Sequence, residues 1–331
     1  MVPRGSPRFR LFFFAVLLLI LGAAVLWRLQ AGDMHISPAV VAEILFSSSP
    51  EATPQEILVV RSIRFPRLFA SLAAGASLAV SGAVLQGVLG NPLADPYTLG
   101  IASGAALGAS MGIHLGGIWV SGAAFAGALA ALGLAFLLSW RAQGISPVSM
   151  VLSGIVVSSI LSAGVTLFKA LSDERVSAIV LWLMGSFSGA SFESAAAVFG
   201  GAVLLFAAAE WWGRELDAMS LGEGRAFFLG VRERRIKITL LVLASLTAAI
   251  TAASFGIIGF VGLVGPHLVR LVLGPSHRSL LAAAFLGGAL LLAGADGAAR
   301  ALGDLPVGVI TALAGGPVFC WILVRQRGGD S

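Results

Sequence analysis

Charged residues are scarce in this chain. Only 11% of its 331 residues are Asp, Glu, Lys or Arg, while 58% are hydrophobic and the mean hydropathy is +0.97. Soluble domains carry roughly 25% charged residues. A water-soluble globule of this size could not bury so much apolar surface, and intrinsic disorder requires the opposite composition. The composition therefore predicts a polytopic membrane protein and excludes a soluble enzyme.

Cysteine and lysine are almost missing. The single cysteine, Cys320, excludes a disulfide within the chain. Neither lysine, Lys169 or Lys237, follows a glycine, so the chain has no phosphate-binding loop of the Gly-Lys-Ser/Thr type. The four histidines are scattered and form no His-Glu-x-x-His pair, and no Gly-x-Ser-x-Gly elbow occurs. We expect no catalytic site, metal or cofactor in this chain.

The apolar residues form long continuous runs, unlike the alternating ten-residue segments of a membrane β-barrel. Because a helix needs about 20 apolar residues to cross a bilayer, the runs predict an all-α protein with about ten transmembrane helices. The third, eighth and ninth runs are short for a full crossing. The runs lie near 9–29, 66–89, 98–113, 118–139, 148–170, 192–212, 237–257, 258–273, 279–295 and 306–324.

The spans form one predicted transmembrane domain, residues 11–324. It is preceded by a cytoplasmic segment, 1–10, whose first six residues resemble a protease-tag scar, and followed by a tail, 325–331. With the amino terminus inside, fourteen Lys and Arg residues fall on the inner side and seven on the outer side. Basic residues gather on the cytoplasmic side, so both termini are predicted to be cytoplasmic.

Three hydrophilic segments are long enough to carry structure of their own. The outer segment 30–65 contains Ser37 followed by Pro38, which predicts a capped amphipathic helix ending at Phe46. A second outer segment is 171–191, and the longest inner segment is 213–236.

The acidic residues fall in loops or at span ends in this interpretation, with Asp296 ending the ninth span. An ion-coupled secondary transporter usually holds a carboxylate in mid-span, so this class is the less favoured alternative. A transporter with neither ATP chemistry nor an ion relay of its own would take its energy from a partner.

Several long motifs occur in order between Arg64 and Trp321. They are RFPR (64–67), GASLAVSGAVLQG (75–87), NPLADPYTLG (91–100), WLMGSF (182–187), LGEGRA (221–226), GFVGLVGPHLVR (259–270) and LPVGVITAL (305–313). Together these motifs resemble the FecCD family, the permease subunits of ATP-binding-cassette (ABC) importers for iron–siderophores, haem and cobalamin. The resemblance implies the type II ABC importer permease fold.

The resemblance assigns a docking role to outer arginines. Arg61, Arg64 and Arg67 lie on the outer side, against the positive-inside trend, and headgroup anchoring or solvated charge would also explain them. In the family, arginines that match Arg64, Arg67 and Arg300 look like sockets for glutamates of the periplasmic or lipid-anchored substrate-binding protein. Opposed charges steer encounter and fix register, so we expect docking there.

The inner segment 213–236 reads as a short helix from Leu216 through Phe228. An amphipathic helix lying on lipid is the alternative, but the resemblance places here the contact that inserts into a cleft of the ATPase subunit. The expected coupling residues are Leu221, Gly222, Glu223, Arg225, Ala226, Phe227, Phe228 and Gly230.

Three places are candidates for the translocation path and its gates. Gln86 is a lone polar residue in the second span, for which a hydrogen-bonding bridge between helices is the favoured alternative. Ser146, Pro147 and Val148 belong to an inner turn that would match the family's cytoplasmic gate. Gly185 and Ser186 end a short helix at the mouth of the path. Either of the last two could also be an ordinary loop.

The sequence therefore predicts a permease subunit of an ABC importer in a bacterial inner membrane. We expect a homodimer with the substrate path on its two-fold axis, two separate ATPase subunits that carry ATP-Mg, and a substrate-binding protein; no nucleic acid is involved. A ferric siderophore is the first choice of cargo, with haem and cobalamin as alternatives.

Overall fold

The computed structural model describes residues 6–30, 32, 34–47, 50–143, 146–220 and 233–327. Within these ranges the chain is helical and has no strand, and each of the ten predicted spans corresponds to a helix. The ten helices are α1 (Pro7–Gln30), α4 (Phe65–Val88), α5 (Ile101–His114), α6 (Val120–Gln143), α7 (Pro147–Leu171), α9 (Phe192–Trp211), α12 (Glu233–Phe255), α13 (Val261–Leu273), α14 (His277–Ala301) and α15 (Val307–Arg327).

Shorter elements lie between the spans. The outer segment folds as α2 (Pro38–Phe46) and α3 (Pro54–Leu58), and a π-helical turn at Val59–Arg64 then leads without a break into α4. The predicted cap of α2 is confirmed, because the Ser37 side chain accepts a hydrogen bond from the Val40 N–H. The remaining short elements are a 3₁₀ turn (Asp173–Arg175), α8 (Val176–Leu183) and α10 (Gly213–Met219).

Span lengths agree with the sequence at two of the three positions predicted to be short. In the described residues, seven helices are long and apolar enough to cross a bilayer. Helix α5 has only 14 residues and α13 only 13, as expected. The prediction for the ninth span is wrong: α14 has 25 residues and runs past Asp296 to Ala301. It continues because Asp296 is neutralised by arginines from other helices, as described below.

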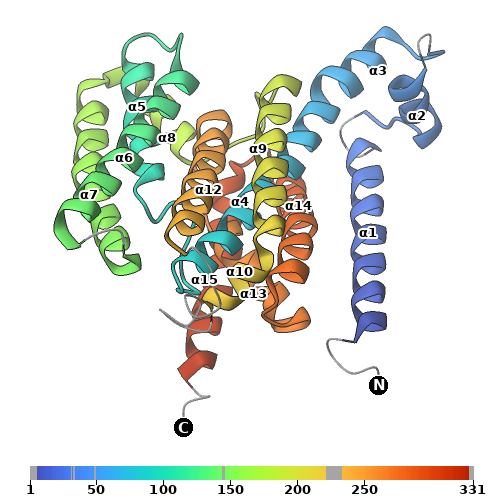
Figure 1. The fold of residues 1–331 in the computed structure, drawn as a ribbon. Coiled ribbons are helices and arrows are strands. Elements are labelled where there is room, and N and C mark those ends of the chain that lie inside the picture. The colour runs from blue at the N-terminus through green and yellow to red at the C-terminus, as the bar shows by residue number, and fades with distance from the viewer. Residues whose placement is uncertain are drawn as a thin grey trace.

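Helix α4 lies at the centre of the bundle, between α12, α9 and α14 (Figure 1). Almost every residue from Pro66 to Val88 is buried. Glycine makes this packing close: a Cβ at Gly75 would overlap the Gly288 carbonyl, and one at Gly82 would overlap the Gly262 carbonyl. Small residues at helix contacts are the usual basis of association in lipid, so α4 is the scaffold on which the other helices are placed.

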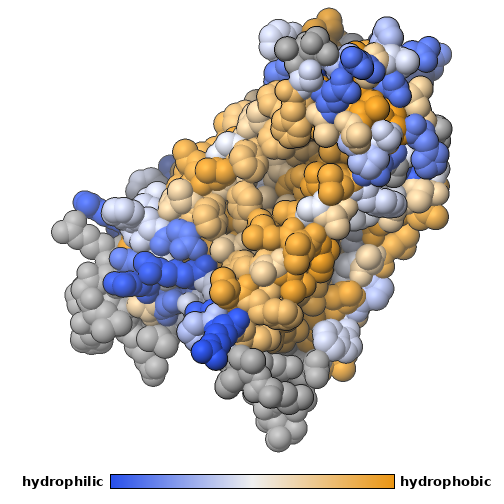
Figure 2. All heavy atoms as spheres, turned by 90° about the vertical axis from the view of Figure 1, so that its right-hand side faces the viewer, coloured by the Kyte–Doolittle hydropathy of each residue, from blue (hydrophilic) through white to orange (hydrophobic). Residues whose placement is uncertain are grey.

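The remaining helices flank this centre. Helices α5, α6 and α7 pack together on one side, and α1 stands on the opposite side, with α14 as its main neighbour (Figure 1). Among the α1 residues only Leu17, Arg28 and Leu29 are buried, as expected for a helix that faces lipid along most of its length. Seen from the α1 side, hydrophobic residues form a broad belt, and hydrophilic residues gather at its two ends (Figure 2).

The two ends of the bundle carry different features. The end at which α1 begins and α15 ends is called the terminal face, and the end that carries α2 and α3 is called the distal face (Figure 1). The sequence predicts the terminal face to be cytoplasmic.

Candidate functional site

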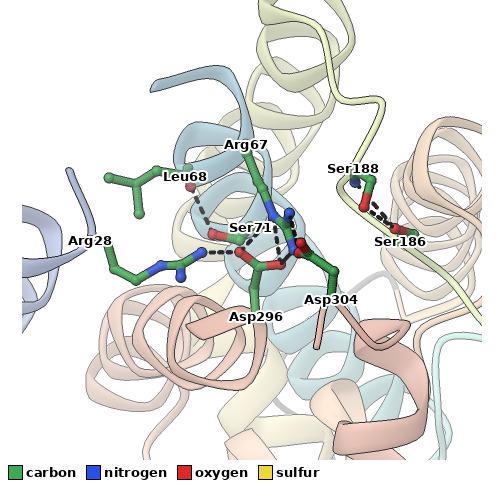
Figure 3. A network of polar contacts seen from close by, with 8 residues as sticks. All are labelled: Arg28, Arg67, Leu68, Ser71, Ser186, Ser188, Asp296 and Asp304. Atoms are coloured by element: carbon green, nitrogen blue, oxygen red, sulfur yellow. Dashed lines mark hydrogen bonds and ion pairs between the residues drawn. The ribbon is translucent and has the colours of Figure 1, made fainter. Parts of the chain in front are cut away.

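The distal face holds a buried network of charged side chains (Figure 3). The Asp296 carboxylate, 1% exposed, accepts hydrogen bonds from Arg67 Nε at 3.0 Å and Arg67 Nη2 at 2.9 Å, and it pairs with Arg28 on its other side. Arg67 also reaches Asp304 at 2.9 Å. These two arginines and two aspartates cancel in charge, which permits burial that a lone ion would not.

This network joins three helices that are far apart in the sequence. Arg28 comes from the last turn of α1, Arg67 from the first turn of α4 and Asp296 from α14. Sequence analysis missed Arg28 and placed Asp296 at a span end. One signal in the sequence points to this network. A basic residue, Arg28, closes the first span, and an acid, Asp296, lies in a long apolar run where it needs a partner of opposite charge.

Arg64 and Arg61 are engaged with backbone carbonyls. Arg64 is 4% exposed and donates to the carbonyls of Leu29 at 2.8 Å and Gln30 at 2.9 Å, and also to that of Met34. It therefore donates to the last carbonyls of α1, which have no hydrogen-bond donor within the helix. Arg61 does the same at the end of α2, donating to the Ile44 carbonyl at 2.9 Å.

These contacts qualify the docking prediction. Arg64 and Arg67 were expected to present their guanidinium groups to a partner, but both are at least nine-tenths buried and are bonded within the chain. Arg300 differs: it is half-buried, and its side chain makes no hydrogen bond or ion pair with the described part of the chain. It lines a pocket of about 340 Å³ together with Trp27, Arg28 and Gly32. Arg300 is thus the predicted docking residue with free donors.

The candidate gate residues after α8, Gly185 and Ser186, form a tightly packed backbone crossing. Gly185 has a φ of +66°, and a Cβ there would lie 2.6 Å from the Ile257 carbonyl oxygen. The Ser186 N–H donates to the Phe255 carbonyl at 2.9 Å. A Cβ at Gly308, at the start of α15, would overlap the Met184 carbonyl. The Gly185–Ser186 segment therefore connects α8 to the ends of α12 and α15.

The predicted gate at 146–148 forms the beginning of α7. Ser146 is its N-cap and exchanges hydrogen bonds with Ser149, and Pro147 occupies the first helical turn, where proline is favoured. Val148 is 68% exposed. An exposed apolar side chain at a helix start can contact a second subunit, and the gate role stays a prediction.

Gln86 lies inside the bundle near the terminal face. It is 3% exposed, and its amide nitrogen is 3.4 Å from the carbonyl oxygens of Ala94 and Gly262. These contacts fit the helix-bridging alternative, and the path-lining role stays a prediction. Gln86 also borders a pocket of about 340 Å³ with Ser220, Arg270 and His277.

The coupling residues Leu221–Gly230 lie outside the described residues. The preceding part of the inner segment is described: α10 begins at Gly213, three residues earlier than the expected helix, and Met219 is its last residue. Sequence analysis missed the contact that holds α10, which joins Asp217 to His277 at the start of α14.

The turn between α4 and α5 is organised by Asp95. Its carboxylate accepts a hydrogen bond from the Tyr97 N–H at 2.9 Å, and the Thr98 hydroxyl accepts one from the Asp95 N–H at 2.8 Å. Burial raises the pKa of Asp95 to about 6. Pro96 packs against Gly262, where a side chain would overlap it. The turn therefore fastens α4 and α5 to α13.

Together, the apolar belt, the glycine-packed spans and the separate polar clusters at the two faces define a polytopic α-helical membrane protein. The sequence model of the FecCD transport family matches residues 17–325. The chain therefore belongs to the FecCD transport family and is a permease subunit of an ABC importer.

Individual relatives and a solved structure agree with this assignment. The chain is 42% identical to the cobalamin import system permease protein of Halobacterium salinarum over 82% of this chain and 74% of that protein. It is 34% identical to the molybdate import system permease protein of Haemophilus influenzae over 99% of both chains. A solved inward-facing conformation of a metal-chelate type ABC transporter superposes with a TM-score of 0.83 at 31% identity, over 95% of this chain and 99% of that chain.

Proposed function

We propose that two copies of this chain form the membrane path of an importer for an iron complex, a ferric siderophore being the first choice. Haem and cobalamin are the alternative cargoes. The observation that carries the proposal is the match of the whole bundle to a metal-chelate type transporter. The chain would lie in a bacterial inner membrane with both termini in the cytoplasm, and two separate ATPase subunits would bind and hydrolyse ATP-Mg.

The substrate-binding protein would dock on the distal face. Arg300 offers free donors beside a pocket, which suits a carboxylate of the partner. Arg64 and Arg67 are buried beneath this surface, where they hold α1, α4 and α14 together. In this proposal Arg300 contacts the substrate-binding protein directly, whereas Arg64 and Arg67 maintain the arrangement of the helices that form the docking surface.

Energy would enter at the terminal face through residues Leu221–Gly230, which follow α10 in the chain. Closure of the ATPase subunits on ATP would move this segment and open the path at one face while closing it at the other. The Gly185–Ser186 crossing and the start of α7 at Ser146–Val148 are the proposed gates. The first is in backbone contact with Ile257, and the second is the capped start of α7.

Uptake into proteoliposomes tests the whole proposal. The chain would be reconstituted with its ATPase and binding protein and offered a ferric siderophore, haem, cobalamin and molybdate in parallel, the last because of the Haemophilus relative. ATP-dependent accumulation of a ferric siderophore is the expected result. Accumulation of molybdate alone would overturn the metal-chelate assignment. Uptake that follows an ion gradient without ATP would support the ion-coupled alternative instead.

Charge reversal tests the docking surface. Arg300→Glu should weaken binding of the substrate-binding protein at least tenfold at low salt, because the partner's acidic group would meet a like charge, and the loss should shrink as salt screens the surface. The matched control is Arg278→Glu, an exposed arginine at the opposite end of the same helix. Unchanged affinity in Arg300→Glu, or an equal loss in the control, would exclude the docking role.

A further inference from the structure

A polar contact at the terminal face joins α10 to α14. The Asp217 carboxylate accepts a hydrogen bond from the backbone N–H of His277 at 2.8 Å, and the same oxygen, Oδ1, lies 2.7 Å from His277 Nδ1. The Ser276 hydroxyl donates to the other carboxylate oxygen at 3.4 Å. Asp217, a residue of α10, therefore caps the N-terminus of α14. Its negative charge is stabilising there because the helix dipole is positive at that end.

The same contact includes the central helix. His277 is 3% exposed, and a Cβ at Gly87 of α4 would lie 2.5 Å from His277 Nε2. A Cβ at Gly213 would lie 3.0 Å from Arg278 Cγ, so α10 touches α14 at a second point. The imidazole is thus enclosed between the carboxylate of α10 and the backbone of α4.

The contact between Asp217 and His277 lies between two regions to which the proposed function assigns roles. Helix α10 ends at Met219, immediately before the expected coupling residues that begin at Leu221. Helix α14 begins at His277 and carries Asp296 and Arg300 in its last two turns. A helix of 25 residues spans roughly 37 Å, so one rigid element connects the region next to the coupling segment with the charged network of the distal face.

We propose that Asp217 and His277 form a latch that transmits movement between the coupling segment and α14. This inference rests on the proposed function, because it assigns a path for the force that ATP supplies. Both are positioning residues: they touch neither ATP nor cargo. Displacement of α10 would pull the first turn of α14. Because Asp296 fastens α14 to α1 and α4, these helices would move together and carry Arg300 with them.

Unpaired buried atoms at the latch support a joint that changes its contacts. Within the described part of the chain, His277 Nε2 and Gln86 Oε1 are both buried without a hydrogen-bond partner, and both residues border the same pocket of about 340 Å³. Buried polar groups are nearly always paired, and exceptions call for an explanation. Two unpaired atoms at one joint leave room for a second arrangement in which they find partners, whereas α4 and α14 are in direct backbone contact where Gly75 meets Gly288.

The test uses the reconstituted importer, with ATP hydrolysis, cargo uptake and the stimulation of hydrolysis by the binding protein measured side by side. In Asp217→Ala, uptake per ATP hydrolysed should fall at least fivefold, and stimulation by the binding protein should be lost. Asp217→Asn keeps the acceptor oxygen and should restore at least half of the coupling. Gly87→Ala displaces the imidazole without changing any charge and should also lower the ratio. Ser191→Ala, which removes the N-cap of α9 elsewhere in the bundle, is the matched control and should couple like wild type.

The outcomes separate the latch from the proposed function. Wild-type protein that shows no ATP-driven uptake would overturn the proposed function itself. If the wild type couples and a folded Asp217→Ala couples equally well, the latch is wrong. If Asp217→Ala does not fold, normal coupling in Gly87→Ala overturns the latch. An equal loss in Ser191→Ala would show that any lost cap uncouples the protein, which also contradicts a specific latch.

Discussion

Replacing Asp296 should destabilise this permease far more than replacing its neighbour Asp304. Asp296 is 1% exposed and holds the guanidinium groups of Arg28 and Arg67. Asp296→Asn would leave the buried network with an uncompensated positive charge. Removing one partner from a buried ion pair typically costs about 3–5 kcal/mol. Asp304 also pairs with Arg67, but its side chain is 63% exposed, and exposed pairs contribute at most about 1 kcal/mol.

The comparison can be made on the purified chain in detergent. A loss of 1 kcal/mol lowers the melting temperature of larger domains by about 2–4 °C. We therefore expect Asp296→Asn to melt at least about 6 °C below the wild type, and Asp304→Asn to melt no more than about 4 °C below it. Equal melting temperatures for the two variants would refute the reasoning, because they would show that burial does not set the strength of the network.

A double substitution separates charge from packing. Arg28→Met combined with Asp296→Leu removes one charge of each sign and leaves the Arg67–Asp304 pair in place. Replacing a buried ion pair with apolar residues of similar volume is often neutral. The double variant should therefore recover at least half of the stability that Asp296→Asn loses. No recovery would mean that the hydrogen-bond geometry at Asp296, rather than the balance of charge, holds α1 to α14.

Two further predictions concern the terminal half of the bundle. Gly82→Ala should lower the free energy of unfolding by about 1–3 kcal/mol, because its Cβ would overlap the Gly262 carbonyl and separate α4 from α13. The control is Gly133→Ala on α6: no atom lies within 4 Å of the new Cβ, so this variant should not lower the melting temperature. Burial raises the pKa of Asp95 from 3.8 to about 6, so this group contributes stability that is fully present below pH 3.8 and is lost as the pH rises through 6. Asp95→Asn keeps an acceptor for the Tyr97 N–H. Its free energy of unfolding should match the wild type near pH 4 and exceed it by up to about 3 kcal/mol at pH 7.5, so its melting temperature should be higher only at pH 7.5. A difference in melting temperature that does not change with pH would contradict this.

The order of the spans and most of their limits follow from local sequence. Continuous apolar runs predict each of the ten helices, and Ser37 before Pro38 predicts the start of α2, because length and capping depend on neighbouring residues. Short α5 and α13 are also predictable, since Gly, Pro and charged residues bound their apolar runs.

Contacts between distant helices were not predictable in this way. Asp296 meets Arg28 across 268 positions of sequence and Arg67 across 229. An acid in an apolar run reads as a span end when its partners cannot be identified, which is why the ninth span was predicted too short. The orientation of Arg64 and Arg67 has the same cause. The end of α1 turns the Arg64 guanidinium inward, and Asp296 of α14 does the same for Arg67, and no local pattern reports either contact.

The long α14 also bears on the energy source. Its buried Asp296 is a carboxylate inside a span, the feature that an ion-coupled transporter would use. Asp296, however, holds two guanidinium groups at once, and a coupling carboxylate must bind and release its cation in every cycle. Release here would require breaking both pairs and would leave buried charges unpaired, at a free-energy cost that repeated turnover does not tolerate. The residue therefore fastens the distal ends of α1, α4 and α14. This argues against ion coupling and agrees with membership of the FecCD family, which makes the chain the permease subunit of an ABC importer.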